Sequence, residues 1–129
     1  MKVINPEGWP RPSGYSNGIV AQGRMLFIAG QIGWNERGEF TSDAFVDQAE
    51  QAMRNVAAVL RAAGGGPEHL VRLTWYVTDK GEYIAASHEL GTAYREIFGA
   101  HYPAMTLVQV AGLLEFRAKV EIEATAVLP

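Results

Sequence analysis

Residues 102–110 have the sequence YPAMTLVQV, residues 111–118 AGLLEFRA and residues 119–127 KVEIEATAV, and these three segments decide the fold. The first and third are rich in residues that favour strands, and the eight residues between them form a connection. Successive side chains of a strand point to opposite faces, so the third segment places Glu121 and Glu123 on one face. We expect two strands here and expect the chemistry of the protein to involve them.

The preceding segment predicts a strand followed by a helix. Residues 70–78 alternate between apolar and more polar side chains, as a strand with one buried face does. Asp79 is suited to cap a helix whose apolar residues continue to Phe98, and Gly99 ends it. Neighbouring strands that are joined through a helix run parallel, so we expect parallel pairing within residues 70–110.

A longer helix is expected further upstream. Apolar residues from Phe45 to Ala63 recur at helical spacing, and charged residues occupy the opposite side. Ser42 is the expected N-cap. The run from Gly64 to Pro67 ends the helix, because glycine tolerates the left-handed conformation there.

The first part of the chain predicts an arm and a hairpin. Residues 5–18 hold three prolines and three glycines, which favour an extended arm over a helix or a central strand. Two apolar runs, residues 18–21 and 24–30, flank the pair Gln22-Gly23. That pattern is typical of a β-hairpin.

The predicted order is therefore hairpin, helix, strand, helix and two strands. It indicates one α+β domain over residues 1–129, with a mixed β-sheet and two helices packed on one face. No third helix is available for the other face, although several strand positions there are apolar or amphiphilic. Self-association is the simplest way to cover that face.

Composition narrows the functional classes. The net charge is −3 and the pI about 5.6, so the chain lacks the basic surface of a protein that binds nucleic acid or an anionic membrane. The absence of cysteine excludes disulfides and thiolate chemistry and is compatible with a reducing cytosol. No apolar run is long enough for a membrane span, and the N-terminus has no signal-peptide core. We expect a cytoplasmic protein.

Two acidic residues are the first candidates for catalysis. Glu121 or Glu123 could orient a water molecule or act as an acid or base. Both could instead be surface residues that pair with Arg72, Arg117 or Lys119, and alternation alone does not separate these alternatives. The three histidines lack metal-ligand spacing, so we expect no metal site.

Several segments together carry a family resemblance: PSGYSN at 12–17, FIAGQIG at 27–33, QAMRNV at 51–56, TAYREIF at 92–98, and YPAMTLVQV at 102–110 with VEIEA at 120–124. Over nearly its whole length, the sequence resembles the Rid family, also called YjgF-type proteins or reactive intermediate deaminases. The resemblance implies a chorismate-mutase-like α+β fold and a homotrimer that binds small molecules in clefts between subunits. It also implies hydrolysis of imines or enamines to a keto acid and ammonia, without a cofactor.

Three positions keep the family pattern. Tyr15 matches the pocket tyrosine, Gly30 matches the glycine after the second strand, and Glu121 matches the glutamate associated with the attacking water. The resemblance therefore makes Glu121 the candidate catalytic residue. Tyr15 and Gly30 become candidates for substrate binding.

Three further positions of the same pocket depart from the pattern. Ala29 replaces a serine or threonine, Gly91 replaces an asparagine, and Met105 replaces an arginine that pairs with the substrate carboxylate. All three are candidates for substrate binding in this chain. We expect their changes to alter which molecules bind.

The change at Met105 matters most. A guanidinium forms charge-assisted hydrogen bonds to a carboxylate worth roughly 1.5–3 kcal/mol each, and methionine forms none. Arg72 and Arg117 are candidates to replace it. The resemblance thus favours a divergent imine or enamine hydrolase whose substrate depends less on carboxylate recognition, or else a non-catalytic binder of small metabolites. An endoribonuclease is disfavoured by the acidic charge.

Overall fold

The computed structural model describes residues 1–129 as two β-sheets and a small set of helices. In chain order the elements are β1 (Lys2–Ile4), β2 (Gly18–Val20), β3 (Arg24–Ile32), α1 (Phe45–Ala62), the 3₁₀ helix η1 (Pro67–His69), β4 (Leu70–Val77), α2 (Lys80–Ala85), α3 (Ser87–Phe98), β5 (Ala104–Gln109) and β6 (Val120–Leu128). None of these helices combines the length and the apolar character that crossing a membrane requires.

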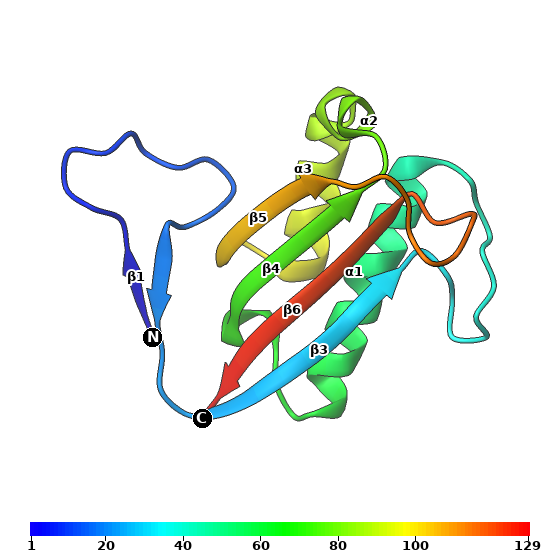
Figure 1. The fold of residues 1–129 in the computed structure, drawn as a ribbon. Helices are drawn as coiled ribbons and strands as arrows, with labels where there is room; N and C mark the ends of the chain where they lie inside the picture. The colour runs from blue at the N-terminus through cyan, green and yellow to red at the C-terminus, as the bar shows by residue number, and fades with distance from the viewer.

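Four strands form one mixed sheet in the order β3-β6-β4-β5. β6 runs antiparallel to β3 and β4, whereas β5 runs parallel to β4. Figure 1 shows α1 and α3 together behind this sheet, and no helix in front of it. The α+β class, the mixed sheet and the parallel pairing of residues 70–110 are therefore confirmed.

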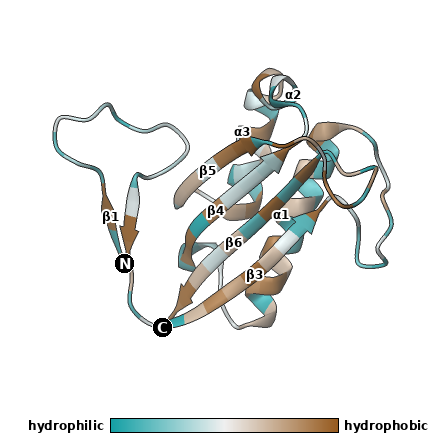
Figure 2. Ribbon diagram, in the orientation of Figure 1, coloured by the Kyte–Doolittle hydropathy of each residue, from teal (hydrophilic) through white to brown (hydrophobic).

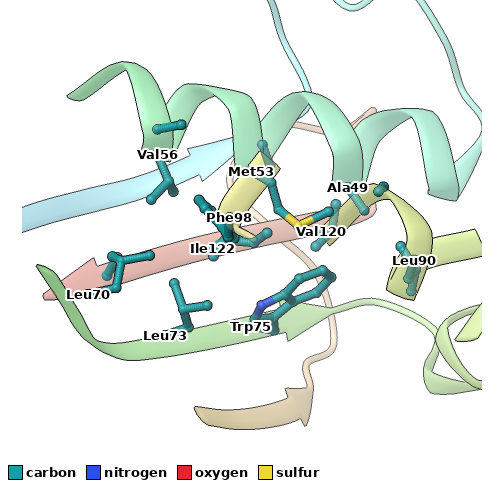
Figure 3. Close-up of a cluster of buried hydrophobic side chains, with 14 of the residues drawn as sticks. Ala49, Met53, Val56, Leu70, Leu73, Trp75, Leu90, Phe98, Val120 and Ile122 are labelled. Carbon is teal, nitrogen blue, oxygen red and sulfur yellow. The ribbon is translucent and has the colours of Figure 1, made fainter. Parts of the chain in front are cut away.

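The core lies between the sheet and the helices behind it. α1 buries Ala49, Met53 and Val56 completely, and every second residue of β6 is buried as well. Figure 3 shows these side chains gathered with Leu73 and Trp75 of β4. Burial of one such large side chain stabilises the fold by about 1.5–3 kcal/mol, so this cluster fixes which face of each strand points inward.

The start of α1 differs from the prediction. Its first residue is Phe45 and its N-cap is Ala44, which makes no side-chain capping bond. Ser42 lies outside the helix, where its hydroxyl accepts a bond from the Ala44 N–H at 3.0 Å and donates one to Asp47 at 2.7 Å. Ser42 therefore orders the approach to the helix instead of capping it.

The second predicted helix is divided into two. Asp79 caps α2 as expected, because its carboxylate accepts a bond from the Gly81 N–H at 2.8 Å. The break comes at Ala86, whose φ of −97° and ψ of 10° depart from helical values. The chain then continues as α3 to Phe98, and Gly99 follows with a φ of 72°.

The hairpin predicted across Gln22-Gly23 is wrong. β2 pairs antiparallel with β1, and β3 pairs with β6. Gly23 has a φ of 150°, whereas a two-residue type I′ turn needs values of about 60–90°. The chain therefore passes from one sheet into the other. Figure 1 shows β1, β2 and the loop between them as an arm beside the main sheet.

The last two strands are not neighbours, because β4 lies between β5 and β6. One face of the sheet remains without helices, and we call it the open face. Figure 2 shows hydrophilic and hydrophobic segments interspersed along its strands. Phe27 is 72% exposed, Met25 60% and Val108 41%. Exposed apolar side chains in this number are typical of an interaction surface.

Candidate functional site

A bulge in β3 lies beneath Glu121. The pairing of β3 with β6 shifts register after Ile28, so Ala29 and Gly30 together face Glu123. A Cβ on Gly30 would stand 2.7 Å from Cδ of Glu121 and overlap the carboxylate. Bulges commonly redirect side chains beside active sites. Only a glycine at position 30 lets the Glu121 carboxylate lie over the β3 backbone.

The two glutamates of β6 differ in their partners. The Tyr76 hydroxyl donates a hydrogen bond to Glu123 at 2.7 Å. This bond is the main reason that the pKa of Tyr76 is raised. Glu121 is half-buried, and its carboxylate takes part in no hydrogen bond or ion pair within the chain. The geometry thus makes Glu121, not Glu123, the carboxylate with oxygens available to bind water.

A second site lies on the other side of the sheet, between β4, β5 and α3. We call it the α3 cavity, and its volume is about 350 Å³, which suits a small organic molecule. About half of its 13 lining residues are hydrophobic, and its aromatic and aliphatic walls include Trp75, Tyr83, Leu90, Tyr94 and Tyr102. The cavity can therefore contact an apolar body and polar groups of a ligand together.

Aromatic packing fixes these walls. Tyr83 stands edge-on to Trp75 with 5.7 Å between ring centroids, and Tyr94 stacks on Tyr102 at 5.3 Å. The Tyr94 hydroxyl donates to the His101 carbonyl at 2.6 Å. Burial raises the pKa of both Tyr83 and Tyr94, so their hydroxyls remain neutral. The α3 cavity is consequently formed before any ligand arrives.

Three of the sequence candidates lie in or beside the α3 cavity. Met105 and Gly91 line it. Tyr15 lies in a smaller cavity of about 250 Å³, and Tyr102 is a wall of both. Ser16 fixes this position, because its hydroxyl donates to the Tyr102 carbonyl at 2.6 Å. The arm therefore carries Tyr15 to the edge of the α3 cavity.

The six candidates do not come together within one chain. Glu121 and the bulge lie on the open face, whereas Met105 packs toward the helices on the opposite face. Glu121 is in register with Tyr76, and Met105 with Leu73, which separates them by roughly 10 Å along the strands as well. A small molecule bound to one chain cannot touch both Glu121 and Met105.

Comparison with known proteins identifies the family. The family model described as Endoribonuclease L-PSP matches residues 10–128. The crystal structure of YyfB from Yersinia pestis, a protein of the conserved Rid family, superimposes with a TM-score of 0.84, at 36% identity over 98% of each chain. The chain belongs to the Rid family. The α+β fold predicted from its sequence is the Rid fold.

Other Rid relatives have names that point to small molecules. A protein of Dermatophagoides farinae named 2-iminobutanoate/2-iminopropanoate deaminase is 30% identical, over 98% of this chain and 96% of its own. TdcF of E. coli, solved with bound serine, is 34% identical, with a TM-score of 0.73 and full coverage of both chains. Some Rid relatives are thus named imine deaminases, and one holds an amino acid.

The family resemblance predicts an arginine where this Rid protein has Met105, and Arg72 and Arg117 were the expected substitutes. Arg72 alternates with the buried Leu73 on β4 and points to the open face. Arg117 pairs with Asp43 at 2.9 Å. Neither Arg72 nor Arg117 lines the α3 cavity, whereas Arg95 does.

Sequence reasoning missed Arg95, although a signal was present. Gly91 and Arg95 are four residues apart on α3 and so share a helix face. Helical side chains lean toward the N-terminus, which directs Arg95 over position 91. The residue one helical turn after Gly91 was the place to look.

Proposed function

We propose that this Rid protein hydrolyses imines or enamines to a carbonyl compound and ammonia, without a cofactor, and that Glu121 handles the attacking water. The observation that carries the proposal is the setting of Glu121. Its carboxylate is half-buried, has no partner in the chain and lies over the bare backbone of Gly30. A carboxylate so placed can accept both a hydrogen bond and a proton from water.

The proposed reaction needs water and one proton carrier. Water adds to the carbon of a protonated C=N bond while Glu121 accepts a proton, which gives a carbinolamine. Glu121 returns that proton to the nitrogen, the C–N bond breaks as the C=O bond forms, and the hydroxyl proton passes through Glu121 to the departing ammonia. Overall, an iminium ion and water give a carbonyl compound and an ammonium ion, and Glu121 ends in its starting state.

We propose further that the reactive cleft forms between copies of the chain. Glu121 and the α3 cavity lie on opposite faces of one sheet, and the open face carries exposed apolar side chains. A second copy could present its α3 cavity to Glu121 of the first. A homotrimer closes such an arrangement. Light scattering should give three times the mass of the chain, and a monomer would contradict the proposal.

The central experiment compares two matched carboxylate variants. Imines are generated in situ from several amino acids and from neutral amines, and ammonia release is measured above the rate in buffer. Glu121→Gln should lower the rate by about 10²–10⁴-fold, because an amide cannot accept the proton. Glu123→Gln changes the same face two residues away and should retain most of the activity.

Two outcomes would contradict this scheme. If wild-type protein accelerates no imine in the panel, the hydrolase proposal fails. If Glu121→Gln and Glu123→Gln lose activity equally, the assignment of Glu121 as the specific proton acceptor fails.

A second candidate, a non-catalytic binder of small metabolites, is supported by Met105. A methionine in the α3 cavity leaves its apolar shape intact and removes a carboxylate partner. Met105→Arg separates the two candidates. Hydrolysis of 2-iminopropanoate gained by this variant would favour a working Glu121 with a changed substrate range, whereas ligand binding without hydrolysis in both proteins would favour the binder.

RNA cleavage has less support. The chain carries a net charge of −3, and Arg95 is the one charged residue that lines the α3 cavity. Binding along a phosphate backbone depends on several neutralising cations.

A further inference from the structure

We propose that Arg95 is the anion-binding residue of the α3 cavity, and that the cavity takes a carboxylate ligand with an aromatic or large apolar body. This inference deepens the proposed function by naming its substrate class. It rests on the proposed small-molecule cleft and does not depend on the catalytic step at Glu121.

The first support is that the Arg95 guanidinium has no partner. None of the four ion pairs of the chain includes Arg95, and its side chain makes no hydrogen bond. No aspartate or glutamate lines the α3 cavity. A guanidinium has five N–H donors in a fixed plane and binds carboxylates through two of them. Arg95 therefore offers the cavity an unused carboxylate-binding group.

The second support is the space above Gly91. A Cβ built on Gly91 would lie 3.4 Å from Nη1 of Arg95, already at contact distance. A longer side chain at position 91, such as asparagine, would compete with the guanidinium for this space. The absence of a side chain at position 91 thus leaves free the space beside the Arg95 guanidinium.

The third support is where the positive charge lies. Met105 belongs to β5, whereas Arg95 belongs to the last turn of α3, so the two contribute to different walls of the cavity. A carboxylate held by Arg95 is displaced from the place where an arginine at 105 would hold it. Aromatic walls such as Trp75 and Tyr83 then contact the body of the ligand. A larger, aromatic carboxylate fits this arrangement better than pyruvate does.

The test is a binding measurement by titration calorimetry with three probes. Phenylpyruvate has the carboxylate and the aromatic body, its methyl ester has the body alone, and pyruvate has the carboxylate without the ring. Wild-type protein should bind phenylpyruvate most tightly. The ester and pyruvate should each bind about tenfold or more weakly, because each lacks one of the two contacts.

The variants identify the cation. Arg95→Gln should weaken phenylpyruvate binding by about 10–100-fold and leave binding of the ester unchanged, which is the effect of losing a charge-assisted hydrogen bond. Arg95→Lys should restore part of the affinity. Gly91→Asn should weaken binding of the acid more than binding of the ester.

Arg61→Gln is the matched control. Arg61 is also an exposed arginine in the last turn of a helix, and it makes no ion pair. Its replacement changes the net charge equally and should not alter binding of any probe.

Three results would overturn the proposal: no binding of phenylpyruvate, equal binding of acid and ester, or equal effects of Arg95→Gln and Arg61→Gln. The titrations are repeated with Glu121→Gln protein. Binding that depends on Arg95 in this variant would support the inference even if no imine is hydrolysed, so the two proposals can fail separately.

Discussion

By the family resemblance, the open face around Glu121 and the α3 cavity differ in how far they match the Rid pattern. The resemblance matches Glu121 and the Gly30 beneath it to that pattern, and their contact depends on both residues. It makes Gly91 and Met105, which line the α3 cavity, expected departures from it. The comparison teaches that, in our proposal, the group that activates water and the groups that choose the ligand lie on separate faces. The groups that choose the ligand can therefore diverge while the group that activates water is preserved.

Ala29 belongs to the bulge and is the exception, since it departs from the pattern on the open face. It is exposed, and its carbonyl accepts a bond from the Gln31 side chain at 3.0 Å. Position 29 tolerates a different side chain, unlike position 30, where a Cβ would overlap the Glu121 carboxylate. The variants below test this division between the two regions, from the largest expected effect to the smallest.

Trp75→Ala should break the α3 cavity and the core behind it. Trp75 is 4% exposed, and truncating a buried aromatic costs about 3–5 kcal/mol of unfolding free energy. Urea unfolding measures the loss. Trp9→Ala is the control, because Trp9 is 61% exposed and its truncation should change stability by about 0.5 kcal/mol or less. Equal losses of unfolding free energy in Trp75→Ala and Trp9→Ala would contradict the assignment of Trp75 to the buried wall of the α3 cavity.

Gly30→Ala should lower the rate of imine hydrolysis without changing ligand binding in the α3 cavity. The added methyl group overlaps the carboxylate and must displace it, and a displacement of about 1 Å can cost roughly 10²-fold in rate. Imine hydrolysis should fall accordingly, while phenylpyruvate affinity stays within about twofold per chain, because the α3 cavity is untouched. Gly112→Ala serves as control, since no atom lies within 4 Å of a Cβ there.

Tyr94→Phe should alter the response of stability to alkaline pH. Burial, helped by nearby Tyr102, raises the Tyr94 pKa above the ordinary value of 10.0. The neutral hydroxyl therefore stabilises the fold below pH 10, and this contribution is lost as the pH rises further. Wild type should lose more unfolding free energy than Tyr94→Phe above pH 10. At neutral pH the variant should be about 1 kcal/mol less stable, through its missing bond to His101.

Tyr76→Phe should have the smallest effect. It removes the hydrogen bond to Glu123 on the open face, and water can replace this bond at an exposed position. Imine hydrolysis should remain near the wild-type rate, because Glu121 has no bond to Tyr76. A large loss of activity would show that Glu123 and Tyr76 take part in imine hydrolysis together with Glu121.

Much of the fold followed from periodicity. The stripe of α1, the alternation of β4 and the alternation that places Glu121 and Glu123 on one face are local patterns, and each is visible within a single segment. The sequence did not predict the partner of β2. Strand pairing is a contact between distant segments, and the pair Gln22-Gly23 resembled a turn although Gly23 adopts a φ of 150°. Local turn chemistry could not exclude β1 as a partner.

The candidate site was less accessible to sequence reasoning. Family resemblance named Gly30 and Glu121, but their contact depends on the register shift after Ile28, which no local pattern reports. Arg72 is the neighbour of Leu73, a residue of the cavity wall, yet alternation turns it to the other face. Arg95 required the geometry of a helix turn and the missing side chain of Gly91.

The attachment of the arm has a consequence for how selectivity could evolve. Ser16 is joined to the start of β5 through a main-chain bond to Pro103 at 3.1 Å and a hydroxyl bond to Tyr102 at 2.6 Å. Ser13 and Gly14, just before this anchor, border the α3 cavity. The loop before Ser16 is thus a variable border of the cavity entrance that is held in place by a fixed anchor. Substitutions there would change which molecules enter while the sheet and its carboxylate stay as they are.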